Sequence, residues 1–189
     1  DGTMSPQIHE KEGVFGRESM KQPTEYKECN VITIEKRNDK NVTDRWFGAH
    51  YGPRIGFNEY VRKTGIKMGQ LKAKDIVFLA DGAKHNWEVQ ITNFPDSIPI
   101  LDFYHVTEHL SLFCETFRNQ SEGKNMYKIW YEMLYDGETV QVICEMKDAL
   151  IKKISNRSEA QKHINYFENN KHRMNYYSYR QRGFPIGSG

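Results

Sequence analysis

Two Asp-Gly pairs are the residues of this sequence most suited to metal chemistry. Asp81-Gly82 directly follows the apolar run 76–80, and Asp1-Gly2 opens the chain. A carboxylate just past a buried strand, followed by a glycine that permits a sharp turn, can present its oxygens to a metal ion. Asp-Gly is also a common turn pair, so each pair alone is better explained as a turn, or Asp81 as a helix cap. The two pairs together suggest a shared site.

A second polar group follows the next apolar run. It contains Asp102, His105, Glu108 and His109. A zinc cluster is one interpretation, but no cysteine accompanies these residues at ligand spacing, and histidines on helices often serve packing or surface roles. Packing or surface roles are therefore favoured over zinc.

The C-terminal segment 171–182 mixes cations with aromatic rings. Cations of this kind bind phosphate, and rings can stack on exposed bases. From the residues alone, a solvated helix end with its tyrosines packed inward is as well supported as DNA contact. The candidate DNA-binding residues are Lys171, Arg173, Tyr176, Arg180 and Arg182.

Composition limits the class of protein. A chain of 189 residues can bury a core in one or two domains, and 38% hydrophobic residues are too many for a disordered chain. The sequence has no run of about 20 apolar residues and no signal peptide, so we expect an intracellular protein without a membrane span. Three widely spaced cysteines in apolar patterns predict buried, reduced thiols. They are Cys29, Cys114 and Cys144.

Charge is distributed unevenly along the chain. The overall net charge is +2, yet residues 147–182 contain nine lysines and arginines against three acidic residues. The rest of the chain is therefore net acidic. An acidic part could hold metal, and a basic part could meet phosphate.

The first half alternates strand and helix signals. The stretch 26–36 is β-branched and roughly alternating, and the polar cluster 38–41 separates it from 42–51, which predicts a hairpin. After the hairpin, segments with apolar residues at helical spacing, which predict helices, alternate with short continuous apolar runs, which predict buried strands. Together with a short leading strand they predict a mixed antiparallel and parallel α/β sheet. The expected elements are a hairpin over 26–36 and 42–51, a helix over 57–65, a strand over 75–80, a helix over 83–93 and a strand over 98–104.

The second half has helical periodicity from about 106 to 177. Apolar stripes recur at three- and four-residue spacing, and Ser158 with Gln161 predicts a capping box for a helix carrying Ile164 and Phe167. We therefore expect a helical block appended to a small α/β sheet.

Three ordered stretches together resemble one family. They are 1–4; 80–83, continuing to 94–95 and 100–105; and 166–189, which ends in Gly183-Phe184-Pro185-Ile186-Gly187-Ser188-Gly189. This ordered set is similar to bacterial insertion-sequence transposases of the ISKra type, which belong to the DDE group and have an RNase H-like core. The resemblance covers nearly the whole chain. It implies a truncated core at 1–105, a helical insertion at 106–177, and a tail at 178–189 that leads back to the core.

The resemblance also implies a site and a reaction. Asp1 and Asp81 match the first two catalytic acids and metal ligands, and the catalytic Glu is expected shortly beyond Gly189. Two Mg²⁺ or Mn²⁺ ions would be held by three carboxylates and would support hydrolysis and strand transfer of DNA at insertion-sequence ends. Asp102 and His105 would be auxiliary residues. The C-terminal cations, placed just before the expected Glu, become better candidates for contact with DNA.

Further expectations follow from the same resemblance. The chain is expected to be a piece of a longer prokaryotic protein, cytoplasmic and nucleoid-associated, that binds DNA and assembles with a second copy. Without the Glu, metal binding should be weak and the fragment inactive. Three alternatives stay open: an inactive DNA-binding remnant of a transposase, another RNase H-like nuclease, and an α/β domain without an active site.

Overall fold

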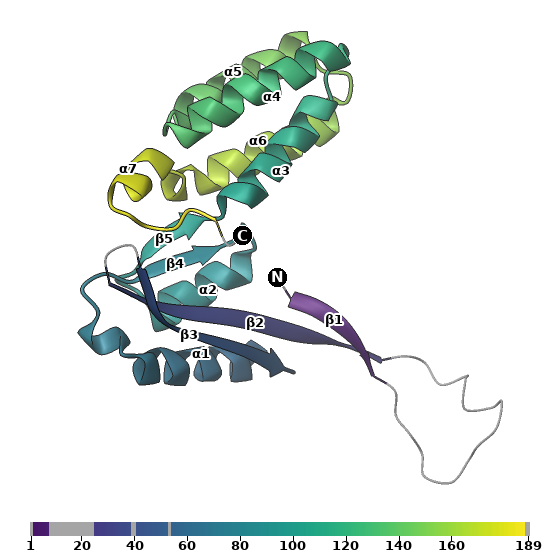
Figure 1. Cartoon of the computed structure of the whole chain (residues 1–189). Coiled ribbons are helices and arrows are strands. Elements are labelled where there is room, and N and C mark those ends of the chain that lie inside the picture. Colours follow the sequence, from purple (N-terminus) through teal and green to yellow (C-terminus); the bar gives the residue numbers. More distant parts are fainter. Residues whose placement is uncertain (1, 8–24, 39–40, 53, 188–189) are drawn as a thin grey trace, which may run out of the picture. The chain divides into compact units, whose positions relative to one another are not determined.

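The chain divides into two compact units, residues 1–73 and 74–189. The structure, a computed structural model, describes residues 2–7, 25–38, 41–52 and 54–187. It confirms a mixed α/β protein with a helical second half (Figure 1). Its strands form two sheets, one in each unit, instead of the single mixed sheet that the sequence predicts.

The first unit is an antiparallel sheet with one helix. Strands β1 (Gly2–Gln7), β2 (Glu25–Asn38) and β3 (Asn41–Tyr51) pair in that order, which confirms the predicted hairpin. A register shift occurs between Lys36 and Arg37. Strand β3 leads into helix α1 (Arg54–Met68), which ends before a 3₁₀ turn, η2 (Gln70–Lys72).

Helix α1 packs on this sheet through aromatic and aliphatic residues. Phe57 and Val61 lie one turn apart and are buried. The ring of Tyr60 lies 5.4 Å from that of Trp46 on β3, centroid to centroid. These contacts give Trp46 a packing role between β3 and α1.

The second unit begins with two parallel strands joined by a helix. Strand β4 (Val77–Ala80) pairs in parallel with β5 (Ile98–Leu101), with Ala80 opposite Leu101. Helix α2 (Lys84–Asn93) makes the crossover, close to the predicted range. The predicted strand 98–104 is too long, because the Asp102 side chain accepts backbone N–H groups of Tyr104 and His105 and so starts a helix there.

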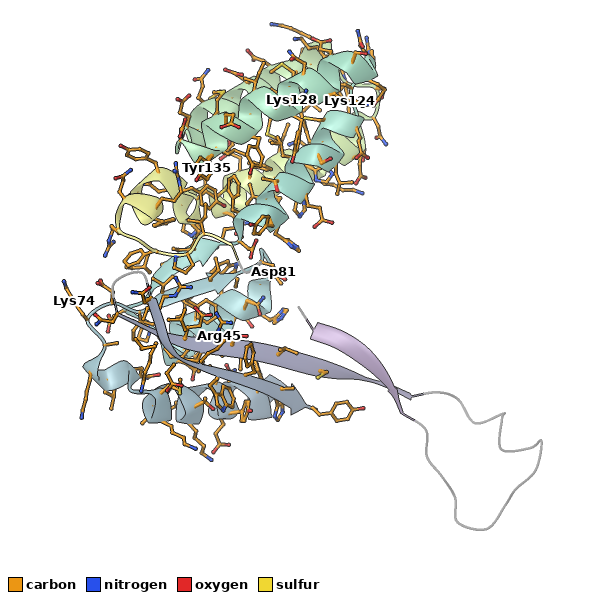
Figure 2. The ribbon with its side chains drawn as sticks, in the orientation of Figure 1. Arg45, Lys74, Asp81, Lys124, Lys128 and Tyr135 are labelled. Atoms are coloured by element: carbon orange, nitrogen blue, oxygen red, sulfur yellow. The ribbon has the colours of Figure 1, made fainter. Side chains whose placement is uncertain are left out.

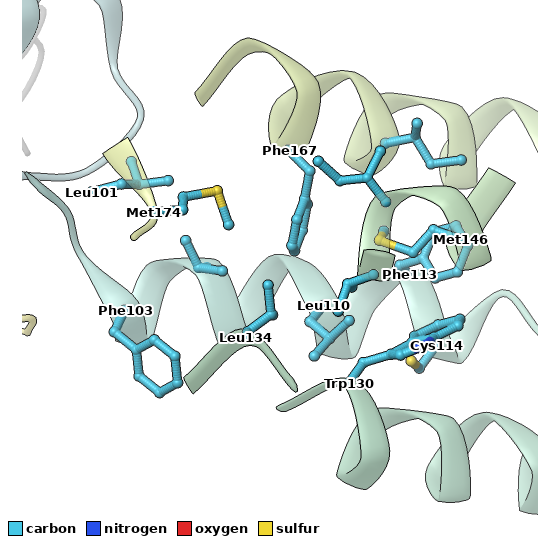
Figure 3. Packing of buried hydrophobic residues seen from close by; sticks show 14 of the residues in the cluster. Leu101, Phe103, Leu110, Phe113, Cys114, Trp130, Leu134, Met146, Phe167 and Met174 are labelled. Atoms are coloured by element: carbon cyan, nitrogen blue, oxygen red, sulfur yellow. The ribbon is translucent and has the colours of Figure 1, made fainter. Parts of the chain in front are cut away.

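Four helices form the larger part of this unit. They are α3 (Phe103–Glu115), α4 (Gln120–Tyr135), α5 (Thr139–Lys152) and α6 (Arg157–Asn170). Each packs on two of the others, in the cyclic order α3, α4, α5, α6. Figure 3 shows part of their shared core, in which Phe113, Trp130 and Phe167 are all almost fully buried.

Asparagine side chains begin two of these helices. Asn119 accepts from the N–H of Ser121 before α4, and Asn156 accepts from that of Glu159 before α6. The predicted capping box at Ser158 and Gln161 is therefore wrong, since α6 has already begun at Arg157. Asn is as strong a cap as Ser, and it stands two residues earlier.

The C-terminal segment returns to strand β5. After η3 (Lys171–Arg173) and α7 (Tyr176–Gln181), the carbonyl oxygen of Ile186 accepts a 2.8 Å hydrogen bond from the N–H of Phe103. None of the described helices combines the length and apolar character that a membrane span requires.

The three cysteines are free thiols in different surroundings. Cys114 is buried, and burial raises the pKa of its thiol to about 12. Cys29 is half-buried and Cys144 is exposed. The prediction that all three are buried is wrong for Cys144, which lies on the solvent side of an amphipathic helix.

Candidate functional site

The carboxyl ends of β4 and β5 bring two acidic residues to one edge of the parallel pair. Asp81 follows β4 directly, and Asp102 follows β5 directly. The strands are in register there, and the N–H of Asp102 donates a 2.8 Å hydrogen bond to the carbonyl oxygen of Ala80. Figure 2 labels Asp81 at this end of β4. Ligand sites in open α/β sheets commonly lie at such an edge.

Asp81 is held in place by the turn that follows it. Its Oδ1 accepts hydrogen bonds from the N–H of Ala83 at 2.8 Å and from Nδ2 of Asn86 at 2.7 Å. Burial acts to raise the pKa of Asp81, but these hydrogen bonds and the nearby His105 contribute to a net pKa below the ordinary value. The carboxylate is therefore ionised at neutral pH, as a metal ligand or an electrostatic group must be.

Asp102 is more deeply buried and begins helix α3. It is 6% exposed, and its Oδ1 accepts from the N–H groups of Tyr104 at 2.8 Å and His105 at 3.2 Å. This arrangement satisfies two helix-terminal donors and places a negative charge at the positive end of the helix dipole. Asp102 therefore caps α3, whether or not it also has an auxiliary role in catalysis.

Tyr166 of α6 covers the turn between Asp81 and α2, a contact that sequence reasoning missed. A Cβ added to Gly82 would overlap the Tyr166 ring and would lie 2.9 Å from its Cζ and Oη. Burial, with the carboxylates of Asp81 and Asp102 nearby, raises the pKa of Tyr166. The only available signal was that Tyr166 belongs to the motif set of the resemblance.

A row of rings continues from Tyr166 to two histidines. His109 stacks on Tyr166 with centroids 3.6 Å apart and planes 13° apart, and its Nδ1 lies 3.0 Å from Nδ1 of His163. At that distance one nitrogen donates and the other accepts, so the pair shares one proton. Burial, together with His163 and His105, lowers the pKa of His109 to about 4, although Glu108 acts in the opposite direction. Burial also lowers the pKa of His163, so both rings are neutral at pH 7.

His105 lies at the outer end of this row. Its Nδ1 is 3.9 Å from Oε2 of Glu108, and its ring centroid is 6.1 Å from that of His109. In the part of the chain that the structure describes, no three His, Cys, Asp or Glu side chains are grouped closely enough to hold a metal ion. That finding gives no support to the zinc alternative. Asp1, the other predicted metal ligand, lies outside the described residues.

Most of the predicted DNA-binding cations have partners inside the protein. The guanidinium carbon of Arg173 lies 3.9 Å from the centre of the Trp87 ring, and that of Arg180 lies 3.4 Å from the centre of the Tyr135 ring. Arg182 forms an ion pair with Asp75 at 3.2 Å. These contacts fasten the C-terminal segment to α2, to α4 and to the residues just before β4.

Lys171 and Tyr176 occupy opposite environments. Lys171 is exposed and pairs with Glu168 at 2.8 Å. Tyr176 is fully buried, and its hydroxyl donates to the carbonyl oxygen of Leu101 at 3.1 Å. A side chain without exposed surface cannot stack on a base, so the prediction of Tyr176 as a DNA-binding ring is wrong. The alternative noted for this segment, tyrosines packed inward, describes Tyr176 correctly.

Comparison of the chain with known protein families, with curated proteins and with solved structures finds no match in any of the three. The function must therefore be argued from the residues and their geometry.

Proposed function

We propose that this chain is part of a DDE transposase of the ISKra type, with an RNase H-like core, that acts on DNA phosphodiester bonds. The observation that carries the proposal is the position of Asp81. It stands at the carboxyl end of a strand in a parallel pair, beside a second carboxylate, in the motif order that the resemblance requires. The two other expected acids are Asp1 and a Glu beyond Gly189.

The carboxylates at this edge fit the chemistry of a hard divalent ion only in part. Asp81 and Asp102 offer oxygen atoms, the ligand type that Mg²⁺ prefers. The described residues do not complete a group of three such side chains, so the proposal relies on Asp1 and on the expected Glu for the remaining ligands. When bound, the ions would activate an attacking water or 3′-hydroxyl and stabilise the leaving oxygen.

The roles of the described residues can be stated separately from the metal. The hydrogen bonds from Ala83 and Asn86 orient the Asp81 carboxylate and keep it charged. The Tyr166 ring covers Gly82 and limits movement of the turn. His105, near Asp81 and half-exposed, is assigned an auxiliary acid/base role, which normal strand transfer by His105→Ala would remove.

An inactive DNA-binding remnant is the second candidate, and one observation favours it. Both carboxylates at the edge already serve structural purposes, because Asp81 braces the turn before α2 and Asp102 caps α3. Asp and Gly at such positions need no catalytic explanation.

Strand transfer by the complete protein distinguishes these functions. The substrate is a labelled DNA end of the insertion sequence, incubated with a target plasmid and Mg²⁺. A transposase joins the label covalently to the plasmid. Cleavage without joining would identify a nuclease instead, and binding without cleavage would identify the inactive remnant.

A further inference from the structure

One face of helix α4 carries a row of tyrosines and lysines that the proposed chemistry does not use. At 100° per residue, five residues of α4 fall within an arc of about 100°, and they extend along about 16 Å of helix. Figure 2 labels three of them, Lys124, Lys128 and Tyr135. We call this row the tyrosine–lysine strip. It consists of Lys124, Tyr127, Lys128, Tyr131 and Tyr135.

The rings of the strip are held in place by neighbouring aromatic residues. The Phe103 ring meets Tyr131 at 5.2 Å and Tyr135 at 5.7 Å, centroid to centroid, both in edge-to-face geometry. Tyr127 lies 6.1 Å from Tyr131. All three tyrosines are half-buried, so part of each side chain stays exposed. A ring that is already fixed loses little conformational entropy when a ligand binds.

The cations of the strip are accessible. Lys124 and Lys128 are exposed, and neither forms an ion pair with any residue in the described part of the chain. At the C-terminal end of the strip, Arg180 stacks on Tyr135 and donates to its carbonyl oxygen at 2.7 Å. Two acids lie on the same helix: Glu122, two residues before Lys124, pairs with Lys153, and Glu132 follows Lys128 by one turn.

These features differ from those of an ordinary solvated helix face. Such a face usually alternates lysines with acids and carries few rings. Here fixed rings and unpaired cations share one row, as in surfaces that bind a single nucleic-acid strand through stacking and phosphate contacts. We propose that the tyrosine–lysine strip of α4 binds unpaired single-stranded DNA. The choice of DNA rests on the proposed function, whereas the surface itself does not involve the acidic edge.

The test is fluorescence anisotropy of a labelled oligothymidine with the chain in EDTA. Lys124→Ala/Lys128→Ala should weaken binding about tenfold at low salt. It should also reduce the slope of log K against log salt by about 1.4, since each phosphate contact on a single strand contributes about 0.7. Tyr127→Leu keeps an apolar side chain and should weaken binding at least several-fold through lost stacking. Glu132→Gln should strengthen binding.

The matched control is Lys74→Ala/Lys152→Ala, which removes the same charge from exposed lysines outside α4 and should leave the affinity within about twofold. Circular dichroism checks that every variant is folded. Unchanged affinity in the strip variant, an equal loss in the control, or tighter binding to a duplex or an RNA oligonucleotide would overturn the proposal. A strip that instead mediates self-association would show as a change in oligomeric state without a change in DNA affinity.

Asp81→Asn separates this proposal from the proposed function. It should bind the oligonucleotide as tightly as the unchanged chain, because no divalent ion is present. If the strip variants bind the oligonucleotide normally, the binding proposal is wrong, and the strand-transfer assay still tests the proposed function. If the complete protein joins no DNA ends, the proposed function is wrong, and the binding assay still tests the strip.

Discussion

Replacing Gly82 with alanine tests the contact between the Asp81 turn and α6. The φ angle of Gly82 is outside the left-handed region, so alanine adds no backbone strain there. The added Cβ would overlap the Tyr166 ring. Overpacking of this kind costs about 1–3 kcal/mol, whereas the lower entropy of the unfolded chain returns about 0.4–1 kcal/mol. We therefore expect Gly82→Ala to lower the free energy of unfolding by about 1–2 kcal/mol.

A double-mutant cycle isolates the ring as the cause. Tyr166→Ala removes the obstacle, so in that background Gly82→Ala should be neutral or stabilising by about 0.5 kcal/mol. The control is Gly123→Ala, whose Cβ would meet the carbonyl oxygen of Cys114 and not Tyr166. Its cost should be the same in both backgrounds.

Urea unfolding followed by circular dichroism at 222 nm measures these differences, because most of the helix lies in the second unit. If Gly82→Ala costs the same with and without the tyrosine ring, Tyr166 does not cover the turn, and our description of this edge is refuted.

Three further predictions concern the same unit. Asp102→Ala should lower the free energy of unfolding by about 1–2 kcal/mol, whereas Asp102→Asn should lower it less, since Asn still caps α3. Equal urea midpoints for the two variants would contradict the capping role. The pKa of His109 is about 4 when folded and about 6.5 when unfolded, so its contribution to the free energy of unfolding should be fully present above pH 6.5 and should fall as the pH drops toward 4. In urea titrations at several pH values, His109→Phe should flatten this dependence. An unaltered dependence would count against the shared-proton pair. Arg173→Ala should cost about 0.5–2 kcal/mol through lost stacking on Trp87, as measured by urea unfolding, and an unchanged midpoint would restore Arg173 as a surface cation available to DNA.

Local patterns were sufficient to predict most elements of this fold. The alternation on either side of the turn near Asn38 predicted the hairpin, and the three- and four-residue spacing of residues such as Leu110, Trp130 and Met146 predicted the helices. The position of Asp81 just after a short apolar run was likewise visible in the sequence.

Contacts between distant segments could not be predicted in this way. The run Ile98–Leu101 continues into Phe103 without a polar break other than Asp102, so the local pattern predicts a strand where α3 begins. Nothing local indicated that Tyr166 would cover Gly82 or that Arg173 would stack on Trp87. These pairs form only when the helical block packs against β4 and α2, and one sequence contains no direct signal of that packing.

The most direct test of the central claim is Mg²⁺-dependent cleavage of insertion-sequence end DNA by the complete protein carrying Asp81→Asn. Asparagine retains an Oδ1 that can accept from Ala83 and Asn86, so the thermal midpoint should stay nearly unchanged while the negative charge is lost. We predict a folded protein whose cleavage falls to background. Cleavage at the normal rate would contradict the assignment and leave Asp81 with a structural role alone.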